Sequence, residues 1–186
     1  MKKHFILLIF GLFMSLSVSA QPAWKTTKAD VTFKIRNAGL SVDGSFGGFM
    51  GTLLFDPAMP EKAQLSASVD AATIETGIGL RNNHLKKPDY FDVANHPRIS
   101  LKSTHVEKKG VNAYLGTFSL TLKGTTRTVM IPFTVTQTGN MAQFAGEFTI
   151  NRRDYDVGGR NLLMSNDVTI MLSIQAQATV PVAATN

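Results

Sequence analysis

The chain has 186 residues, no cysteine and a formal net charge of +6, with 19 Lys and Arg against 13 Asp and Glu. The absence of cysteine excludes disulfides, thiolate metal sites and cysteine nucleophiles. The basic residues are scattered and do not alternate with aromatic residues, so nucleic-acid binding is not expected.

The first 20 residues have the three parts of a secretory signal peptide. Lys2 and Lys3 form the positive start, residues 5–14 form the apolar run, and Val18-Ser19-Ala20 forms a cleavage site. The apolar run is too short to span a bilayer. We therefore expect an exported protein, periplasmic or secreted, with one domain over residues 21–186 and no stable membrane insertion.

From residue 30 onwards, apolar and polar residues alternate in one segment after another. In 30–37, for example, Val31, Phe33 and Ile35 share one face. The same alternation occurs in 63–70, 98–104, 114–124, 127–135, 144–150 and 167–176. Period-two alternation is typical of antiparallel strands with one buried and one solvated face.

Turn sequences such as Asp56-Pro57 and Lys123-Gly124 separate these segments, and seven to nine strands of this kind form a sandwich or a barrel. The glycine-rich stretch 44–56 is apolar on both faces, which indicates a corner or a close approach of another element. Pro132 indicates an edge position or a bulge. A barrel of about eight strands is either just filled by side chains or holds one small ligand, and the pattern alone leaves both open.

A transmembrane barrel would show the same alternation. Such barrels carry aromatic girdles at both membrane interfaces, whereas this chain has one Trp and three Tyr. A barrel with a water-facing exterior is therefore favoured.

Residues 73–92 interrupt the strand pattern. We expect a short helix from about Gly79 to Lys87, ended by Pro88 and lying across one end of the barrel. A zinc site could recruit His84, Asp89, Asp92 and His96 from this region. No H-E-x-x-H or H-x-H spacing occurs, however, and Pro88 separates His84 from the acids, so no metal site is predicted.

The same residues are better explained as a structural polar knot. In this interpretation Arg81 and His84 bond Asp89 or Asp92 and fasten the turn.

No catalytic constellation stands out. The sequence around Ser45, DGSFGG, does not match G-x-S-x-G, and GIGL at 77–80 lacks the third glycine of a dinucleotide fingerprint. The sequence INRRDY at 150–155 is interpreted as a salt-bridged strand end. We predict that the protein is not an enzyme and needs no cofactor.

Five segments in register resemble the YceI-like polyisoprenoid-binding family of exported bacterial proteins, from about Trp24 to Gln175. The most specific is SVDAATIETGIGLRNNHLKKPDYFD at 68–92. The others are VTFKIRNAGLSVDGSFGGFMGTLLFD, HPRISLKST, GTFSLTLKGTTRTV and FTINRRDYDVG. Asp156, where the family usually has glycine, and Leu101, where phenylalanine is common, depart from the pattern and bear on the shape of the cavity.

The resemblance implies an all-β, antiparallel, lipocalin-like β-barrel of about eight strands with a short helix near the mouth. It implies that the apolar interior binds, sequesters or transports a long amphipathic lipid of the polyisoprenoid or isoprenoid-quinone type, without catalysis. A homodimer is left open. The alternatives are an enzyme acting on a lipid or another small molecule, and an exported stress-response protein with an incidental cavity.

The predicted site has three parts. The apolar cavity is formed by Phe33, Ile35, Leu65, Val69, Ile78, Leu85, Phe91, Ile99, Leu101, Phe118, Leu120, Phe133, Phe144, Phe148, Ile170 and Leu172. The lipid head group is expected at the mouth, near Arg81, Lys86 and Lys87. His84, Asp89 and Asp92 form the structural polar knot.

Overall fold

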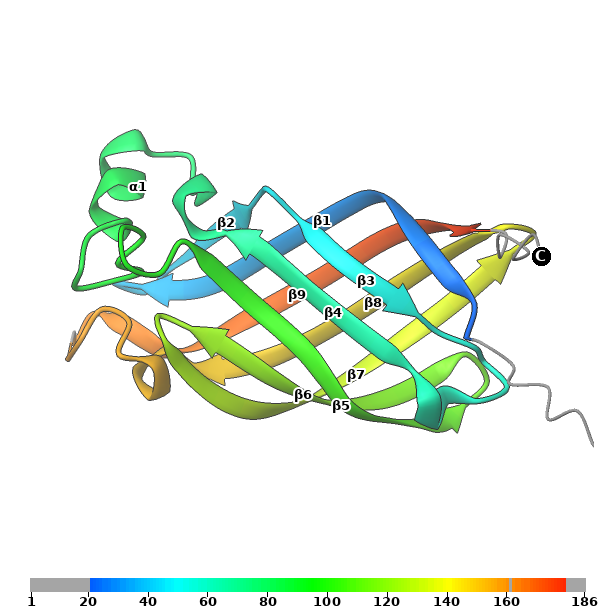
Figure 1. Cartoon of the computed structure of the whole chain (residues 1–186). Coiled ribbons are helices and arrows are strands. Elements are labelled where there is room, and N and C mark those ends of the chain that lie inside the picture. Colours follow the sequence, from blue (N-terminus) through cyan, green and yellow to red (C-terminus); the bar gives the residue numbers. More distant parts are fainter. Residues whose placement is uncertain (1–20, 161, 180–186) are drawn as a thin grey trace, which may run out of the picture.

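The computed structural model describes residues 21–160 and 162–179, so the predicted signal peptide, residues 1–20, lies outside the described residues (Figure 1). The elements are, in chain order, β1 (Ala23–Asn37), β2 (Leu40–Phe46), β3 (Met50–Leu54), η1 (Pro60–Lys62), β4 (Gln64–Asp70), η2 (Ala71–Thr73), α1 (Gly79–Leu85), β5 (Arg98–Gly110), β6 (Ala113–Leu122), β7 (Thr125–Thr138), β8 (Met141–Asn151), η3 (Arg152–Tyr155) and β9 (Met164–Thr179). Within these residues, no helix is both long enough and apolar enough to cross a membrane.

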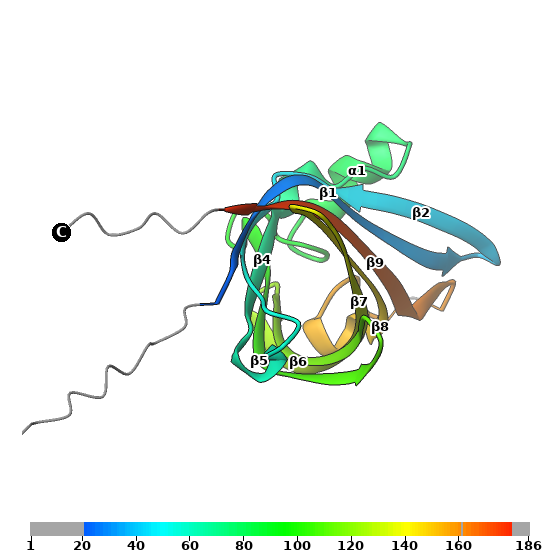
Figure 2. The same cartoon turned by 90° about the vertical axis from the view of Figure 1, so that its right-hand side faces the viewer.

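Eight antiparallel strands close into a barrel. Their order is β1-β3-β4-β5-β6-β7-β8-β9, and β9 pairs back onto β1 along most of the length of both strands. Figure 2 shows the closed wall nearly end-on. The predicted lipocalin-like barrel is therefore confirmed.

β2 is an additional strand outside this ring. It pairs with β1 from Val31 to Asn37, whereas β3 pairs with β1 only at Ala23 and Trp24. The chain crosses from β2 to β3 through the glycine-rich stretch. Gly44 lies opposite Phe33, where a Cβ atom would come within 2.3 Å of the Phe33 ring. The close approach expected from the sequence is therefore made by the Phe33 side chain.

Five aromatic residues fill one end of the barrel, and we call them the aromatic plug: Trp24, Phe55, Tyr114, Phe133 and Phe144. Phe55 has no exposed surface, and its ring lies 5.0 Å from that of Tyr114 and 5.7 Å from that of Phe144. The indole Nε1 of Trp24 donates a hydrogen bond of 2.9 Å to the Phe55 carbonyl. Edge-to-face aromatic pairs of this kind pack densely, so this end is closed by side chains.

The opposite end, which we call the mouth, is covered by the segment between β4 and β5 (Figure 1, left). The helix expected from Gly79 to Lys87 is present as α1, which ends at Leu85 with Lys86 as its C-cap. The connection between β8 and β9, which includes η3, lies at the same end.

Pro132 marks a fork in the barrel wall. β7 pairs with β6 from Thr125 to Thr134, but it pairs with β8 only from Phe133 to Thr138. Proline has no N–H group and so cannot donate a hydrogen bond to β8. Pro132 accordingly lies at the point where the β7–β8 ladder stops. Tyr155 of η3, 2% exposed, is one of the residues beside this fork. The predicted edge position of Pro132 is therefore confirmed for the side that faces β8.

Candidate functional site

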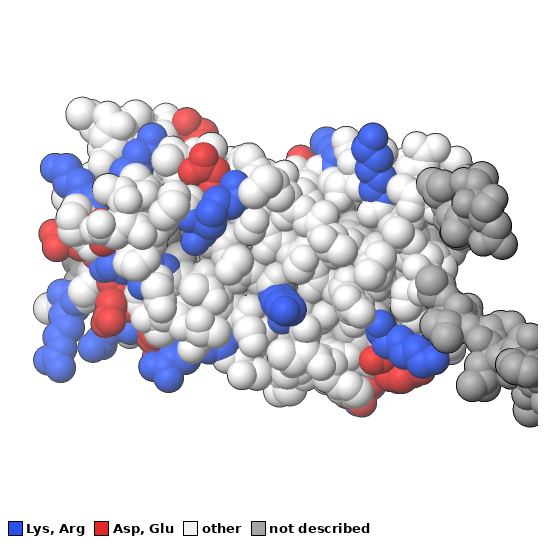
Figure 3. Space-filling view, in the orientation of Figure 1, with Lys and Arg blue, Asp and Glu red and all other residues white. Residues whose placement is uncertain are grey.

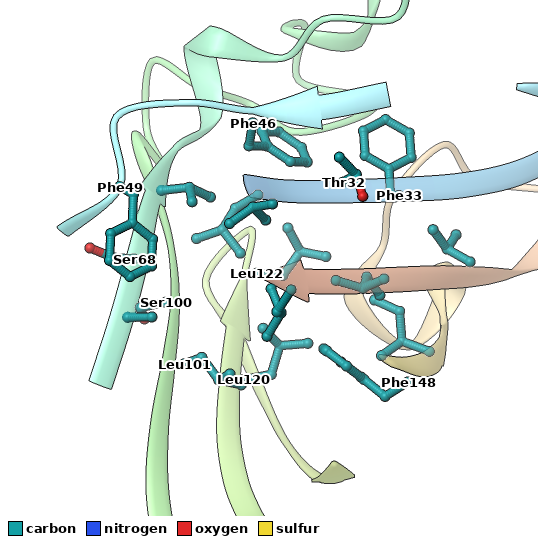
Figure 4. A pocket seen from close by; sticks show the side chains of 18 of the residues that line it. Thr32, Phe33, Phe46, Phe49, Ser68, Ser100, Leu101, Leu120, Leu122 and Phe148 are labelled. Carbon is teal, nitrogen blue, oxygen red and sulfur yellow. The ribbon is translucent and has the colours of Figure 1, made fainter. Parts of the chain in front are cut away.

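The interior between the aromatic plug and the mouth contains an apolar cavity, the middle chamber, with a volume of about 130 Å³. Side chains from six of the barrel strands and from the β2–β3 crossing line it, among them Phe46, Phe49, Leu120, Leu122 and Phe148 (Figure 4). An apolar cavity of about 150 Å³ holds a benzene molecule, so the middle chamber can hold a hydrocarbon group of about that size.

A smaller cavity, the inner chamber, adjoins the aromatic plug and has a volume of about 60 Å³. Phe133 and Phe144 of the plug form part of its wall. Ala67, Leu101 and Leu172 line both this chamber and the middle one. The two spaces are therefore separated by side chains.

A third cavity, the mouth chamber, lies below α1 and has a volume of about 80 Å³. Leu85 and Phe91 from the segment over the mouth form part of its wall. Phe33, Arg152 and Val168 line both this chamber and the middle one. The three chambers thus follow one another from the mouth to the plug.

The predicted cavity residues lie along this row, with one exception. Those that line a chamber are Phe33, Ile35, Leu65, Val69, Leu85, Phe91, Ile99, Leu101, Phe118, Leu120, Phe133, Phe144, Phe148, Ile170 and Leu172. Ile78 does not line any of the three, and its side chain is 52% exposed. It precedes α1 outside any strand, so the inside-outside alternation of a strand does not apply to it. Contact of the other residues with a lipid stays a prediction.

A polar network fastens α1 to the barrel, and it is centred on the buried Asn82. The Asn82 Oδ1 atom accepts from the Thr76 hydroxyl at 2.6 Å and from the Thr76 N–H at 2.9 Å. The Asn82 Nδ2 atom donates to Glu75 Oε1 at 2.8 Å, and the Arg81 Nε atom donates to the Thr76 hydroxyl at 2.8 Å. Both the oxygen and the nitrogen of the buried Asn82 amide are hydrogen-bonded, so the side chain is held in one orientation. The first turn of α1 is therefore fixed to Glu75 and Thr76, which precede it.

Glu75 connects this network to β2. Its backbone exchanges two hydrogen bonds with Ser45, of 2.9 and 3.0 Å. Its carboxylate accepts from Asn82 and from the backbone N–H groups of Gly77 and Thr76, and these bonds lower the pKa of Glu75. Hydrogen bonds to the charged form are the physical cause, because they stabilise the carboxylate.

The structure corrects the predicted pairing of the polar knot. Asp92 lies 3.9 Å from His96 Nε2 and accepts from the Asn95 amide at 3.0 Å. His84 instead packs edge-on against Tyr90, with ring centroids 4.9 Å apart. Asp89 is tied through its backbone carbonyl, which accepts from the Gly158 N–H at 2.8 Å. The fastening contacts of α1 therefore come from Glu75, Thr76 and Asn82.

The three predicted head-group residues lie in different places. Arg81 lines the mouth chamber, but its guanidinium donates to the hydroxyl and the carbonyl of Thr76. Lys86 and Lys87 line none of the three chambers. Over residues 21–160 and 162–179, no three His, Asp or Glu side chains converge as metal ligands.

Arg152 is a buried cation that the sequence analysis missed. It is 3% exposed and, contrary to the expected salt-bridged strand end, donates to uncharged acceptors. These are the carbonyls of Ser165, Val157, Gly159 and Met164 and the side-chain oxygen of Asn166. Burial, and then the charge of Arg153, lower the pKa of Arg152. The charged residues that line the three chambers are thus Arg152 and Arg81, both cationic.

Comparison with known proteins identifies a family and relatives of similar sequence. A family described as the YceI-like domain matches residues 23–176. A UPF0312 protein of Ectopseudomonas mendocina is 31% identical over 154 residues, which cover 79% of this chain and 81% of that protein. The protein YceI of Escherichia coli is 28% identical over 94% of this chain and 97% of its own.

Two solved structures share the fold. BcnA of Burkholderia cenocepacia superposes with a TM-score of 0.77 at 27% identity, covering 80% of this chain and 96% of BcnA. A polyisoprenoid binding domain from Saccharophagus degradans superposes with a TM-score of 0.68 over 87% of this chain and all of that domain. At 15% identity, the second likeness is evidence for the fold alone.

Proposed function

The chain belongs to the YceI-like family, and we propose that its barrel binds a long amphipathic lipid of the polyisoprenoid or isoprenoid-quinone type without acting on it chemically. In this proposal the protein sequesters the lipid or carries it outside the cytoplasm, in the periplasm or the medium. The Saccharophagus degradans structure with the same fold is described as a polyisoprenoid binding domain, which supports the choice of lipid class.

The row of three chambers is the observation that carries this proposal. Each chamber is too small for a long lipid chain, but side chains such as Leu172 and Phe33 form the divisions between neighbouring chambers. Rotation of these side chains joins the chambers into one channel that is blocked by the aromatic plug. A lipid chain would enter from the mouth with its hydrocarbon end first and leave its polar group near α1.

Partition of the hydrocarbon from water supplies the affinity. Each buried CH₂ group contributes roughly 0.8 kcal/mol, so about ten buried carbon atoms contribute roughly 8 kcal/mol before the cost of ordering the chain. No covalent step is required for this, and the chamber walls present apolar side chains, hydroxyls, amides and two guanidinium groups.

The two guanidinium groups favour a particular charge on the lipid. Arg81 and Arg152 give the mouth chamber a positive potential, because a guanidinium stays protonated in proteins. A neutral lipid with a carbonyl or hydroxyl oxygen, or an anionic lipid, is compatible with this potential. An alkylammonium head group is disfavoured by it.

Organic extraction of the natively purified protein, followed by mass spectrometry, tests the proposal. We expect one isoprenoid lipid at close to equimolar amount. The variant Phe118→Glu places a charge on the wall of the inner chamber and should lose the lipid. Its neighbour on β6, Thr117→Glu, changes the outer face of the same strand and should retain it.

A wild-type protein that is free of lipid and does not take up a polyisoprenoid after delipidation would contradict the proposal. Retention of the lipid by a folded Phe118→Glu variant would show that the lipid lies elsewhere. N-terminal sequencing of the protein from the periplasmic fraction tests export, and the expected first residue is Gln21.

A further inference from the structure

Exposed apolar side chains gather at the mouth of the barrel. They belong to three separate elements: Leu40 at the β1–β2 turn is 72% exposed, Leu80 on α1 is 84% exposed, and Leu162 before β9 is 103% exposed. These elements share one end of the molecule (Figure 1, left). Single exposed apolar residues are common on protein surfaces, but three exposed leucines on separate elements at one end form a pattern.

Each of these leucines is close in sequence to a residue that lines the mouth chamber. Leu40 is two residues from Val42, Leu80 is followed by Arg81, and Leu162 is two residues from Met164. The exposed apolar tips therefore surround the proposed entrance for the lipid.

Basic side chains accompany the leucines. Arg36, Lys87, Arg127, Arg153 and Arg160 are exposed at this end, together with the exposed acids Glu75, Asp89, Asp154 and Asp156. Figure 3 shows more Lys and Arg than Asp and Glu there. Among the described residues, Lys28 and Lys109 form ion pairs away from the mouth and Lys34 pairs with Asp43 beside the mouth chamber, whereas the five basic residues named above form none. The positive charge at the mouth is thus available to an outside partner.

We propose that the mouth docks reversibly on an anionic lipid bilayer, with Leu40, Leu80 and Leu162 in the interface and the basic side chains against the head groups. Apolar tips together with cationic side chains are the features that hold peripheral proteins at such a surface. This inference rests on the proposed lipid-binding function, because docking lets the lipid pass between bilayer and barrel without crossing water.

Sedimentation with vesicles tests the docking. We expect the wild type to bind phosphatidylcholine vesicles that contain phosphatidylglycerol, to bind pure phosphatidylcholine vesicles weakly, and to dissociate as salt screens the charges. Leu40→Ser combined with Leu80→Ser should weaken binding to the anionic vesicles about tenfold or more. These positions are exposed, so the substitutions should leave folding intact.

The plugged end offers a matched control. Val111 at the β5–β6 turn is 91% exposed and Met141 after the β7–β8 turn is 38% exposed. Val111→Ser combined with Met141→Ser should bind anionic vesicles as the wild type does. Equal losses in the two double variants, or no binding of the wild type to anionic vesicles at low salt, would overturn the inference.

Fluorescence provides a second measurement. In a Leu80→Trp variant, lipids brominated in the acyl chain should quench the added indole, whereas in a Val111→Trp variant they should not. The natural Trp24 lies in the aromatic plug and should stay unquenched in the wild type. Quenching that is equal at positions 80 and 111 contradicts docking through the mouth. The lipid content of the purified protein, measured separately, decides the proposed function itself.

Discussion

The two ends of the barrel are built from the same strands but filled differently. At the plugged end, β1 contributes Trp24, β6 contributes Tyr114 and β7 contributes Phe133, and these rings belong to one buried cluster. Towards the mouth, β6 and β7 present the smaller residues Leu122 and Val129, and β1 presents Val31 next to the larger Phe33. On β6 and β7 the inward side chains thus become smaller towards the mouth, while the two strands stay paired.

We therefore expect the plugged end to determine the stability of the barrel and the mouth to determine binding. The plug is a dense aromatic core, and its loss should unfold the barrel. The mouth is held by the Asn82 network and by half-buried rings such as Phe46 and Phe91, whose centroids lie 5.4 Å apart. Contacts of this kind permit rearrangement, and a ligand that enters the barrel requires rearrangement at one end only.

The substitution Phe55→Ala should give the largest effect, because it removes the ring at the centre of the plug. We expect the free energy of unfolding to fall by about 3–5 kcal/mol, the range for a fully buried phenylalanine. Phe46→Ala at the mouth should cost roughly 1–2 kcal/mol, because part of that ring is already exposed. Urea denaturation of the delipidated proteins measures the free energy of unfolding of both variants. Equal losses in the two variants would contradict the difference in stability between the two ends.

The substitution Asn82→Ala should destabilise the mouth by about 1–3 kcal/mol, since it removes the acceptor of the buried Thr76 hydroxyl and one of the two acceptors of the Thr76 N–H. Hydrogen exchange should accelerate in α1 and stay unchanged in β6 and β7 near the plug. Asn83→Ala, at the exposed neighbouring position, is the control and should have little effect. Faster exchange throughout the barrel would mean that the two ends unfold as one unit.

The substitution Ala67→Phe should change the bound lipid more than the stability. Ala67 lines both the middle and the inner chamber, so a ring at this position separates them. We expect shorter lipid chains in the extract and a fall of about 1–3 kcal/mol in the free energy of unfolding of the lipid-free protein, the range for inserting a larger side chain into a core. Thr52→Phe on the outer face of β3 is the control. An unchanged chain length would show that the lipid does not reach the inner chamber.

The smallest expected effect is the pH dependence of stability that comes from the Glu75 carboxylate. Its pKa in the folded protein lies below the ordinary value of 4.5, because Asn82 and backbone N–H groups donate to the carboxylate. Its contribution to stability is therefore complete above 4.5 and is lost as the pH falls through the lowered value. The wild type should lose protection of α1 from hydrogen exchange over this range, and Glu75→Gln should show a flatter dependence. A steeper loss in Glu75→Gln would contradict the assignment.

Much of the fold could be predicted from the sequence because strand alternation is a local property. Residues such as Val31 and Phe33 or Phe118 and Leu120 show their burial through spacing alone. The same rule identified the chamber walls within strands and failed at Ile78, which belongs to no strand.

The polar contacts could not be predicted in the same way. Asn82 accepts from Thr76 only because the chain turns sharply at Gly77, whose φ is +83°. Arg152 is satisfied by two carbonyls of the loop after η3 and by the carbonyls of the first two residues of β9. Sequence spacing suggests carboxylates as partners for arginine and histidine, whereas this structure uses backbone carbonyls and an aromatic ring.

Closure of the barrel by β1 and β9 has a consequence for how the chain folds. The Thr179 hydroxyl bonds the carbonyl of Ala23, which lies 156 positions earlier. The hairpins from β5 to β8 need only short loops and can form early, whereas the β1–β9 ladder must wait for the last strand. A chain that stops before β9 exposes the edges of β1 and β8, which invites pairing with other chains. The final strand therefore controls both the rate of folding and the risk of aggregation.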